Sequence, residues 1–252
     1  MKNSDYPWLP RNEPIPLVEN EIHVWRASTN TPPSVGNQLA QLLSPDELAR
    51  LGRYRFERDR LRFMTGRGIL RILLGAYLEL DPKQLIFDYG PHGKPHVNQE
   101  STQSPIQFNL SHSEDLSLFA FTKNARIGVD LEHLRPIPEV DQICERFFAP
   151  GEKTTMRGLP EDQKLEAFFT GWTRKEAYVK ALGESIIPAL DQVEVSLISG
   201  ESTQLIIDVD NPEMIDKFSL ISQVPLTGYL AAIAVENKSW VMRHFDFRME
   251  VP

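Results

Sequence analysis

Cysteine is nearly absent from this chain of 252 residues, in which Cys144 is the single example. One thiol excludes an internal disulfide and a zinc site built from cysteines. A reducing, cytoplasmic setting is therefore expected. A run of about 18 apolar residues, which a membrane span requires, is also missing. The polar, proline-rich start, MKNSDYPWLPRNEPIP, has no apolar stretch typical of a signal peptide, so none is expected.

Positive charge is scarce overall, because 27 basic residues face 35 acidic ones and the net charge is −8. Proteins that bind nucleic acid are usually basic, so this balance argues against that class. One segment departs from it: Arg50 to Arg71 holds eight arginines and no lysine, against Glu57 and Asp59. Arginine makes bidentate contacts with phosphate and carboxylate. The segment is therefore either a solvated helix face or a surface for an anionic partner.

The order of predicted elements favours an α+β fold. Strands and helices occur in segregated runs, and the order strand–helix–helix–strands occurs twice, which argues against a doubly wound sheet. We therefore divide the chain into residues 1–124 and 125–252. The predicted strands are 21–27, 85–89, 106–110, 116–122, 127–132, 193–198, 204–209, 218–223, 228–235 and 240–247, and the predicted helices are 45–53, 58–80, 138–148 and 161–182.

The helix predicted at 161–182 carries a carboxylate on its apolar face. Glu176 lies four residues after Trp172 and seven after Phe169, which places the three side chains on one face. A carboxylate in such a stripe needs a partner, because an unpaired buried charge is costly. The partner is either Lys180, one helical turn further on, or a cation or reacting group supplied by the rest of the fold.

The strand predicted at 127–132 carries a second acidic pattern. Asp130 and Glu132 share one strand face, about 7 Å apart along the chain, while Val129 and Leu131 face the core. Such a pair is either turned toward solvent or gathered around a cation, since adjacent carboxylates repel. With Glu176 as the third carboxylate, the set suits Mg²⁺, which completes its shell with waters and substrate phosphates.

Two further clusters suggest anion binding. Asn109-Leu110-Ser111-His112-Ser113 could present hydroxyl, imidazole and backbone donors to an anion, or could simply form a turn. Ser111 and His112 are a poor nucleophile–base pair, because adjacent strand residues point apart. Lys94, in Gly93-Lys94-Pro95, could hold a phosphate. Three acids, several basic groups and no covalent nucleophile fit phosphoryl-type transfer.

These motifs together resemble the 4′-phosphopantetheinyl transferases, specifically the large pseudo-dimeric, Sfp-like type that activates nonribosomal peptide and polyketide synthetases. Gly128-Val129-Asp130-Leu131-Glu132 is similar to the family's G-(V/I)-D-x-E, and Phe169 to Lys180 is similar to its motif with W-x-x-K-E-A-x-x-K. The N-x-S-H-S and G-K-P motifs also match, and Arg50, Arg62 and Arg67 fall in the basic N-terminal half.

The resemblance implies a role for each matching residue. Asp130, Glu132 and Glu176 would bind Mg²⁺, which Mn²⁺ could replace, and Glu176 would also be the base for the attacking serine. Lys175 and Lys180 would stabilise the diphosphate of coenzyme A. The phosphates of coenzyme A would be held by Arg50, Lys94, Asn109, Ser111 and His112, with His112 at the 3′-phosphate.

The reaction implied by the resemblance moves 4′-phosphopantetheine from coenzyme A to a serine of an apo acyl or peptidyl carrier protein. It would release adenosine 3′,5′-bisphosphate. Two similar halves would form a pseudo-dimer with the active site at their interface, so a monomer is expected. The rivals are a Mg²⁺-dependent phosphohydrolase or nuclease and a carrier-binding module without activity. The net charge opposes nucleic acid, and the complete set of three acids opposes an inactive module.

Overall fold

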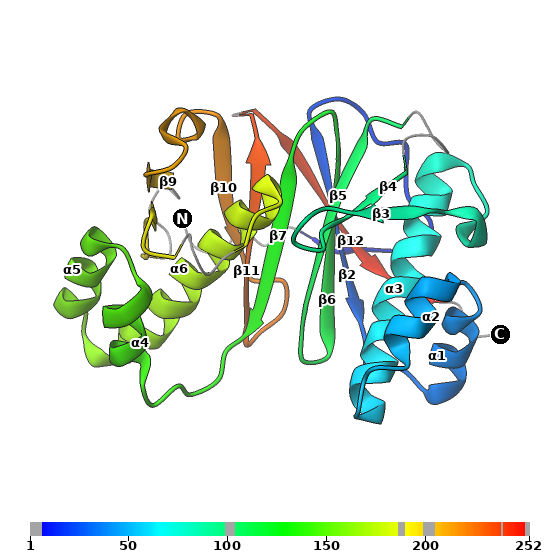
Figure 1. Ribbon diagram of the computed structural model, residues 1–252, viewed down its shortest axis with the longest axis horizontal. Coiled ribbons are helices and arrows are strands. Elements are labelled where there is room, and N and C mark those ends of the chain that lie inside the picture. Colours follow the sequence, from blue (N-terminus) through cyan, green and yellow to red (C-terminus); the bar gives the residue numbers. More distant parts are fainter. Residues whose placement is uncertain (1–6, 99–103, 186–189, 199–204, 238, 250–252) are drawn as a thin grey trace.

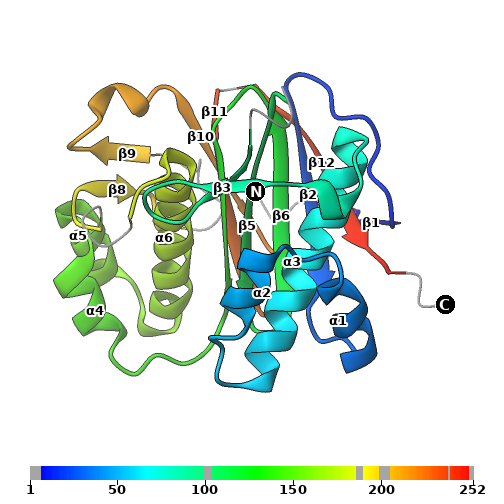
Figure 2. The same ribbon diagram turned by 45° about the vertical axis from the view of Figure 1, so that its right-hand side comes forward.

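The computed structural model describes residues 7–98, 104–185, 190–198, 205–237 and 239–249, and all structural statements below concern these ranges. Two β-sheets stand in the middle of the molecule, and each carries one long helix on its outer face (Figure 1). The turned view separates the two helical layers and places α3 and α6 on opposite sides of the sheets (Figure 2). The architecture is α+β, as predicted.

The N-terminal half forms a sheet covered by α3. Its core contains Trp25, Leu70, Phe119 and Phe121, all with no exposed surface. The half contains β1 (Leu9–Arg11), β2 (Glu21–Ser28), α1 (Pro33–Ala40), α2 (Pro45–Leu51), α3 (Glu57–Leu78), β3 (Phe87–Tyr89), β4 (Pro95–Val97), β5 (Ile106–Ser113) and β6 (Leu116–Lys123), with a short 3-10 turn at Pro82–Gln84.

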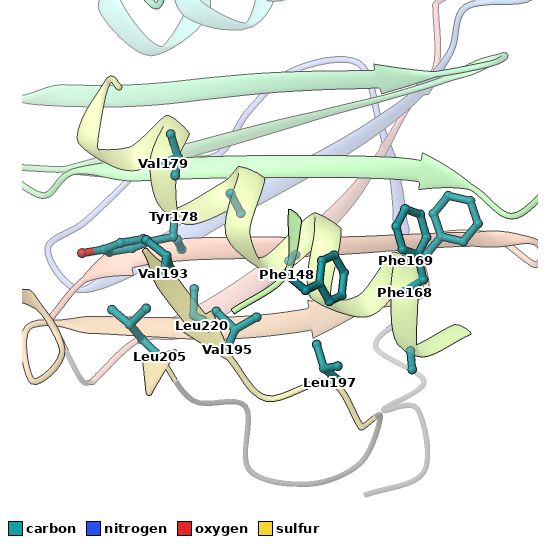
Figure 3. Packing of buried hydrophobic residues seen from close by; sticks show 14 of the residues in the cluster. Phe148, Phe168, Phe169, Tyr178, Val179, Val193, Val195, Leu197, Leu205 and Leu220 are labelled. Atoms are coloured by element: carbon teal, nitrogen blue, oxygen red, sulfur yellow. The ribbon is translucent and has the colours of Figure 1, made fainter. Parts of the chain in front are cut away.

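The C-terminal half places α6 against a three-stranded antiparallel sheet of order β10-β11-β7. Phe148, Phe168 and Tyr178 pack on the side of α6 turned away from β5 and β6 (Figure 3). The half contains β7 (Ile127–His133), α4 (Val140–Phe147), α5 (Pro150–Gly158), α6 (Glu161–Leu182), β8 (Val193–Val195), β9 (Leu205–Asp208), β10 (Phe218–Gln223), β11 (Tyr229–Glu236) and β12 (Val241–Phe247), with a 3-10 turn at Pro212–Met214.

The last strand returns to the first half. β12 lies between β1 and β2 and runs parallel to both, in a five-stranded sheet of order β1-β12-β2-β6-β5. A shared apolar cluster also joins the two sheets, with buried residues from β2, β6, β7 and β11 such as Val24, Leu118, Val129 and Ile233. The halves are therefore tied by both a strand and a core.

Four short strands and α-helices were not predicted: β1, in the proline-rich start of the chain, and three others that each have a local reason. α1 and α5 begin at Pro33 and Pro150, which suits the first helical turn, but both are only about two turns long and too short for a clear helical pattern. β4 begins at Pro95, the last residue of the Gly93-Lys94-Pro95 motif, where no strand was predicted. The strand predicted at 106–110 extends to Ser113, so part of the expected turn is β structure.

The end of α6 follows its sequence. Gly183 takes a left-handed conformation, with φ of 80°, and its N–H group reaches back to Val179 and Lys180. Glycine adopts this conformation without the steric cost of a side chain. The predicted bounds of 161–182 are therefore confirmed. Among the described residues, no helix has the length and apolar character needed to cross a membrane.

Candidate active site

The second half of helix α6 exposes one narrow stripe. Most of this half is buried, and Trp172, Glu176 and Lys180 are the partly exposed positions between Gly171 and Ala181. These three residues are spaced by four, so they lie above one another on a single helix face. The stripe is therefore the surface through which α6 can meet a ligand.

Strand β7 approaches α6 unusually closely at Gly128. A Cβ atom at this position would lie 2.0 Å from the carbonyl oxygen of Ala177 and 2.5 Å from the backbone nitrogen of Ala181. Only glycine permits this approach, because any side chain would overlap the helix backbone. The approach brings Asp130, two residues further along β7, next to the exposed stripe of α6.

Lys180 and Asp130 form the centre of the site. The ammonium group of Lys180 lies 2.6 Å from Asp130 Oδ1. The hydroxyl of Ser111, on β5, donates to the same oxygen at 3.0 Å and lies 3.3 Å from the Lys180 amine. The other oxygen, Asp130 Oδ2, is buried and has no hydrogen-bond partner among the described residues. One carboxylate therefore has one satisfied and one unsatisfied oxygen.

Charges in the site shift one another's protonation. Burial raises the pKa of Glu176 to about 6; Lys180 opposes this shift, while Asp130 and Glu132 add to it. Burial also raises the pKa of Glu132, with a further contribution from Asp130. Burial lowers the pKa of Lys180, but the three carboxylates outweigh it, and the net shift is upward. The cluster thus combines a well-protonated amine with carboxylates that need more positive charge.

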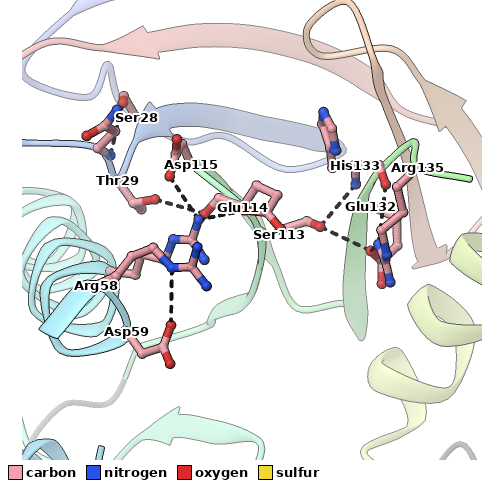
Figure 4. Close-up of polar contacts among 12 residues, drawn as sticks. Ser28, Thr29, Arg58, Asp59, Ser113, Glu114, Asp115, Glu132, His133 and Arg135 are labelled. Atoms are coloured by element: carbon pink, nitrogen blue, oxygen red, sulfur yellow. Dashed lines mark hydrogen bonds and ion pairs between the residues drawn. The ribbon is translucent and has the colours of Figure 1, made fainter. Parts of the chain in front are cut away.

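Glu132 is held from the N-terminal half. Ser113, at the end of β5, donates its hydroxyl hydrogen to Glu132 Oε2 at 3.0 Å (Figure 4). Arg135 reaches the same oxygen at 3.3 Å from the loop after β7. All contacts of Glu132 within the described part of the chain fall on Oε2, which leaves Oε1 for a ligand.

The donor set fits a divalent cation of the Mg²⁺ type. Asp130, Glu132 and Glu176 supply hard oxygen donors, and the unpartnered Asp130 Oδ2 is a buried acceptor that a cation would satisfy. Within the described ranges, no three or more His, Cys, Asp or Glu side chains lie in a group that could hold a metal ion by themselves. Waters and substrate oxygens would therefore have to supply the rest of a coordination shell, as is usual for Mg²⁺.

Lys175 does not lie in the cluster, contrary to the role that the sequence motif suggested. Its side chain has no exposed surface, and its amine lies 2.5 Å from Glu152 Oε2 on the core side of α6. It also donates to the carbonyl oxygen of Leu190. Successive helix residues are about 100° apart, so Lys175 points into the core when Glu176 points outward. Coenzyme A bound at the stripe would not reach this amine.

Arg50 and Lys94 lie outside the carboxylate cluster. Arg50 borders a cavity of about 470 Å³, together with Asp46, Glu47, Arg53, Tyr54 and Tyr89. The Lys94 amine donates to the carbonyl oxygens of Ile127 and Ala181, at 2.9 and 3.3 Å, and burial lowers its pKa to about 8. Lys94 thus bridges the loop after β3 to β7 and α6, instead of presenting a free amine.

The remaining predicted residues lie on β5. Asn109 is buried, and its Oδ1 accepts a hydrogen bond from Val129 N at 2.9 Å, so this side chain joins β5 to β7. His112 lies at the edge of the site with its surface open to solvent. The protein atoms around it exclude part of the water from its ring, which lowers its pKa, and the charges of Lys180 and Arg62 lower it further. His112 is therefore a neutral group beside two cations at neutral pH.

Sequence reasoning gave no individual role to Ser113 or Glu152. The spacing of Asn109, Ser111 and Ser113 by two could have indicated Ser113, because alternate strand residues share one face. Glu152 carries no comparable signal, because its partner Lys175 is 23 residues away in the sequence and on another helix.

Comparison with known proteins gives matches over nearly the whole chain. Residues 126–234 match the profile of the 4′-phosphopantetheinyl transferase superfamily, and residues 25–124 match that of the 4′-phosphopantetheinyl transferase N-terminal region. The chain is 41% identical to the 4′-phosphopantetheinyl transferase HetI of Nostoc sp. over 240 residues, which is 95% of this chain and 98% of that protein.

A second relative is the 4′-phosphopantetheinyl transferase psf-1 of Bacillus pumilus, with 32% identity over 184 residues, 73% of this chain and 76% of that protein. A human relative, L-aminoadipate-semialdehyde dehydrogenase-phosphopantetheinyl transferase, is 28% identical over 163 residues, which is 62% of this chain and 53% of that protein. These relatives give no support to a phosphohydrolase or a nuclease.

Proposed function

Because the chain belongs to the 4′-phosphopantetheinyl transferase superfamily, we propose that Asp130, Glu132, Glu176 and Lys180 form its active site. The enzyme transfers the 4′-phosphopantetheine group of coenzyme A to a carrier protein and is, in that sense, a holo-[acyl-carrier-protein] synthase. The observation that carries the proposed site is the contact between Lys180 and Asp130, 2.6 Å apart beside an unpartnered carboxylate oxygen.

Asp130, Glu132 and Glu176 would hold Mg²⁺, with Mn²⁺ as a substitute of similar ligand preference. The metal, when bound, would neutralise charge on the diphosphate of coenzyme A. Lys180 adds a fixed positive charge at the same place, and its raised pKa keeps it protonated at neutral pH. Charges fixed before the reaction stabilise a transition state without reorganisation.

Glu176 is the proposed base for the serine of the carrier. In the metal-free protein, burial raises the pKa of Glu176 to about 6, and a bound cation would keep its carboxylate ionised and able to accept a proton. The serine oxygen forms the new bond to the phosphorus that bears pantetheine, and the bond from that phosphorus to the oxygen of the departing group breaks. The serine proton passes to Glu176, directly or through a water, and adenosine 3′,5′-bisphosphate leaves.

The adenosine end of coenzyme A is assigned to the cavity beside α2. Arg50 and Arg53 supply charge for a phosphate there, and Tyr54 and Tyr89 supply rings against which a base can stack. His112 would donate to the 3′-phosphate, whose charge would favour the protonated ring. The Lys94 amine is bound to two carbonyl oxygens, so Lys94 would support coenzyme A indirectly, by holding β7 and α6 in place.

The carrier protein is assigned to the exposed arginines at the start of α3. Arg55, Arg58 and Arg60 are exposed, and Phe56 beside them keeps 61% of its surface exposed. A basic surface with an apolar centre is complementary to an acidic helix of a carrier protein that exposes an apolar residue. Charge reversal of the three arginines to Glu should raise KM for the carrier and leave KM for coenzyme A unchanged. An equal rise in both would contradict the assignment.

We also propose a boundary between the two halves near Asn124 and a pseudo-dimeric relation between them. Each half has a 22-residue helix, α3 or α6, on the outer face of a sheet. One chain holds all the residues of the proposed site, which supports a monomer. A cytoplasmic location remains the proposal that the single, buried Cys144 supports.

Intact-mass spectrometry of an apo acyl carrier protein tests the function. After incubation with the enzyme, coenzyme A and Mg²⁺, the carrier should gain the mass of one phosphopantetheine group on its serine. EDTA should prevent the gain, and Mn²⁺ should restore it. No gain on several different carriers, while coenzyme A still binds, would contradict the transfer. Breakdown of coenzyme A without any carrier would favour a phosphohydrolase.

A further inference from the structure

Strands β5 and β7 belong to different sheets, and side chains of β5 connect them. Asn109 Oδ1 accepts a hydrogen bond from Val129 N at 2.9 Å, and Ser113 Oγ accepts one from His133 N at 3.0 Å. The four residues advance in the same direction on both strands, so the two strands run side by side and parallel. Side chains spaced by two residues thus take the place of a backbone ladder.

The same row of β5 side chains holds the two carboxylates of β7. Ser111 donates to Asp130 Oδ1 and Ser113 donates to Glu132 Oε2, each at 3.0 Å. In both cases the serine binds one oxygen of the carboxylate, while the second oxygen has no described hydrogen-bond partner. The arrangement repeats at two alternate positions on the same face of β7, so each acid is oriented by one hydroxyl from the other half.

The donor and acceptor roles of the Ser113 hydroxyl follow from its two hydrogen-bond partners. A backbone N–H group can only donate, so Ser113 Oγ must accept from His133 N. An ionised carboxylate can only accept, so the hydroxyl hydrogen must point to Glu132 Oε2. The direction of each hydrogen bond is therefore determined. Together the two bonds hold the Glu132 carboxylate at a defined position relative to the β7 backbone.

Arg135 is a weaker holder of the same oxygen. Its guanidinium lies 3.3 Å from Glu132 Oε2, and 53% of its side chain is exposed. Exposed ion pairs with long side chains contribute little, because they are solvated and mobile. Ser113 has a short side chain on a strand and two hydrogen bonds, so it restricts Glu132 more strongly than Arg135 does.

We propose that Ser113 is a positioning residue that orients Glu132 for the divalent cation. This inference rests on the proposed metal site and adds to it a residue that does not touch the metal. Loss of a hydrogen bond that orients a metal ligand typically weakens metal binding about 10- to 100-fold. Ser113→Ala should therefore weaken binding of the cation, and it should weaken binding of coenzyme A alone to a smaller extent.

The test measures Mn²⁺ affinity by electron paramagnetic resonance of the free ion, in the presence of enzyme and coenzyme A. Ser113→Ala should raise the Mn²⁺ dissociation constant at least about tenfold. Ser113→Thr keeps the hydroxyl and should restore most of the affinity. Ser219→Ala, which removes a hydroxyl bonded to Asn237 on the other side of the half, is the matched control and should change nothing.

Thermal unfolding of the same variants separates positioning from strand joining. If Ser113→Ala lowers the melting temperature but binds Mn²⁺ as the wild type does, the hydroxyl only joins the strands, and the inference is overturned. Equal weakening in Ser113→Thr would also overturn it, because the retained hydroxyl would then have no effect. If the wild type with coenzyme A binds no Mn²⁺, the metal site itself fails, and this inference fails with it.

Discussion

Two of the three lysines of helix α6, Lys175 and Lys180, lie five residues apart in opposite environments. Lys175 has no exposed surface and is paired with Glu152 on the core side, where its amine also lies 5.0 Å from the centre of the Phe148 ring. Lys180 is partly exposed and paired with Asp130 on the side turned toward β5. In both pairs the lysine comes from α6 and the carboxylate from another element, but only the second pair borders groups that a substrate can reach.

The difference lies in what surrounds each carboxylate. Both oxygens of Glu152 are occupied, because Oε1 accepts from Val195 N and Oε2 accepts from Ala149 N in addition to Lys175. Asp130 keeps one buried oxygen without a partner. A satisfied buried pair fixes the packing of α5, α6 and β8, whereas an unsatisfied one marks a site that needs a ligand. The pairing of charges alone therefore does not identify an active site.

The largest expected effect comes from breaking the buried pair. Lys175→Met removes the cation and leaves the Glu152 carboxylate buried, which should lower the free energy of unfolding by about 3–5 kcal/mol. Urea denaturation measures the change. The double variant Glu152→Gln/Lys175→Met removes both charges, and its loss should be smaller than the sum of the single losses. Lys83→Met, at an exposed lysine, is the control. Unchanged stability of Lys175→Met would contradict the structural role.

The next effect concerns the exposed pair and should appear in the rate. Lys180→Met removes the fixed charge beside the diphosphate, and kcat/KM should fall by about 10²- to 10³-fold. The melting temperature should fall less than in Lys175→Met, because Lys180 is partly exposed and Asp130 keeps its hydrogen bond from Ser111. Steady-state kinetics with an apo carrier protein provide the measurement. If Lys180→Met strongly lowers the melting temperature but keeps the wild-type rate per folded molecule, Lys180 has a structural role and the comparison with Lys175 is wrong.

The smallest effect is a gain of stability at the exposed stripe. In the metal-free protein, Glu176 has a pKa of about 6 against an ordinary value of 4.5. The ionised form of Glu176 is therefore less favourable in the folded state than in the unfolded state. The free energy of unfolding falls as pH rises from about 4.5 to about 6 and above. Glu176→Gln should stabilise the protein in EDTA by up to about 2 kcal/mol at pH 7.5.

The gain from Glu176→Gln should shrink to less than about half at pH 5, where the folded carboxyl is mostly protonated. Urea denaturation at the two pH values tests this dependence. A loss of stability at pH 7.5, or a gain that grows as pH falls, would contradict the raised pKa.

Sequence patterns drew attention to the three acids of the proposed site, because these acids interrupt clear periodicities. Glu176 interrupts an apolar helix stripe, and Asp130 and Glu132 alternate with buried residues on β7. The environment of Lys175 could not be predicted in the same way. The second half of α6 is buried almost all around, so its periodicity does not distinguish the core side from the side of the substrate.

Long-range pairings limited the prediction of the fold. Most strands of the two main sheets were predicted near their true bounds, but β12 pairs with β2 more than 200 residues earlier in the chain. Parallel strands are not joined by a tight hairpin turn, so no turn residues in the sequence indicate this pairing. The role of Ser113 depends on β5 and β7 lying side by side, and a single strand pattern does not contain that arrangement.

The most direct test of the account compares two carboxylate variants in one assay. Single-turnover rates of carrier modification are measured for Asp130→Asn and Glu152→Gln, each normalised to the concentration of folded enzyme. The account predicts a rate for Asp130→Asn at least about 100-fold below that of the wild type, and a rate for Glu152→Gln close to the wild type. Equal rates for both variants would contradict the division between a packing face and a catalytic face of α6.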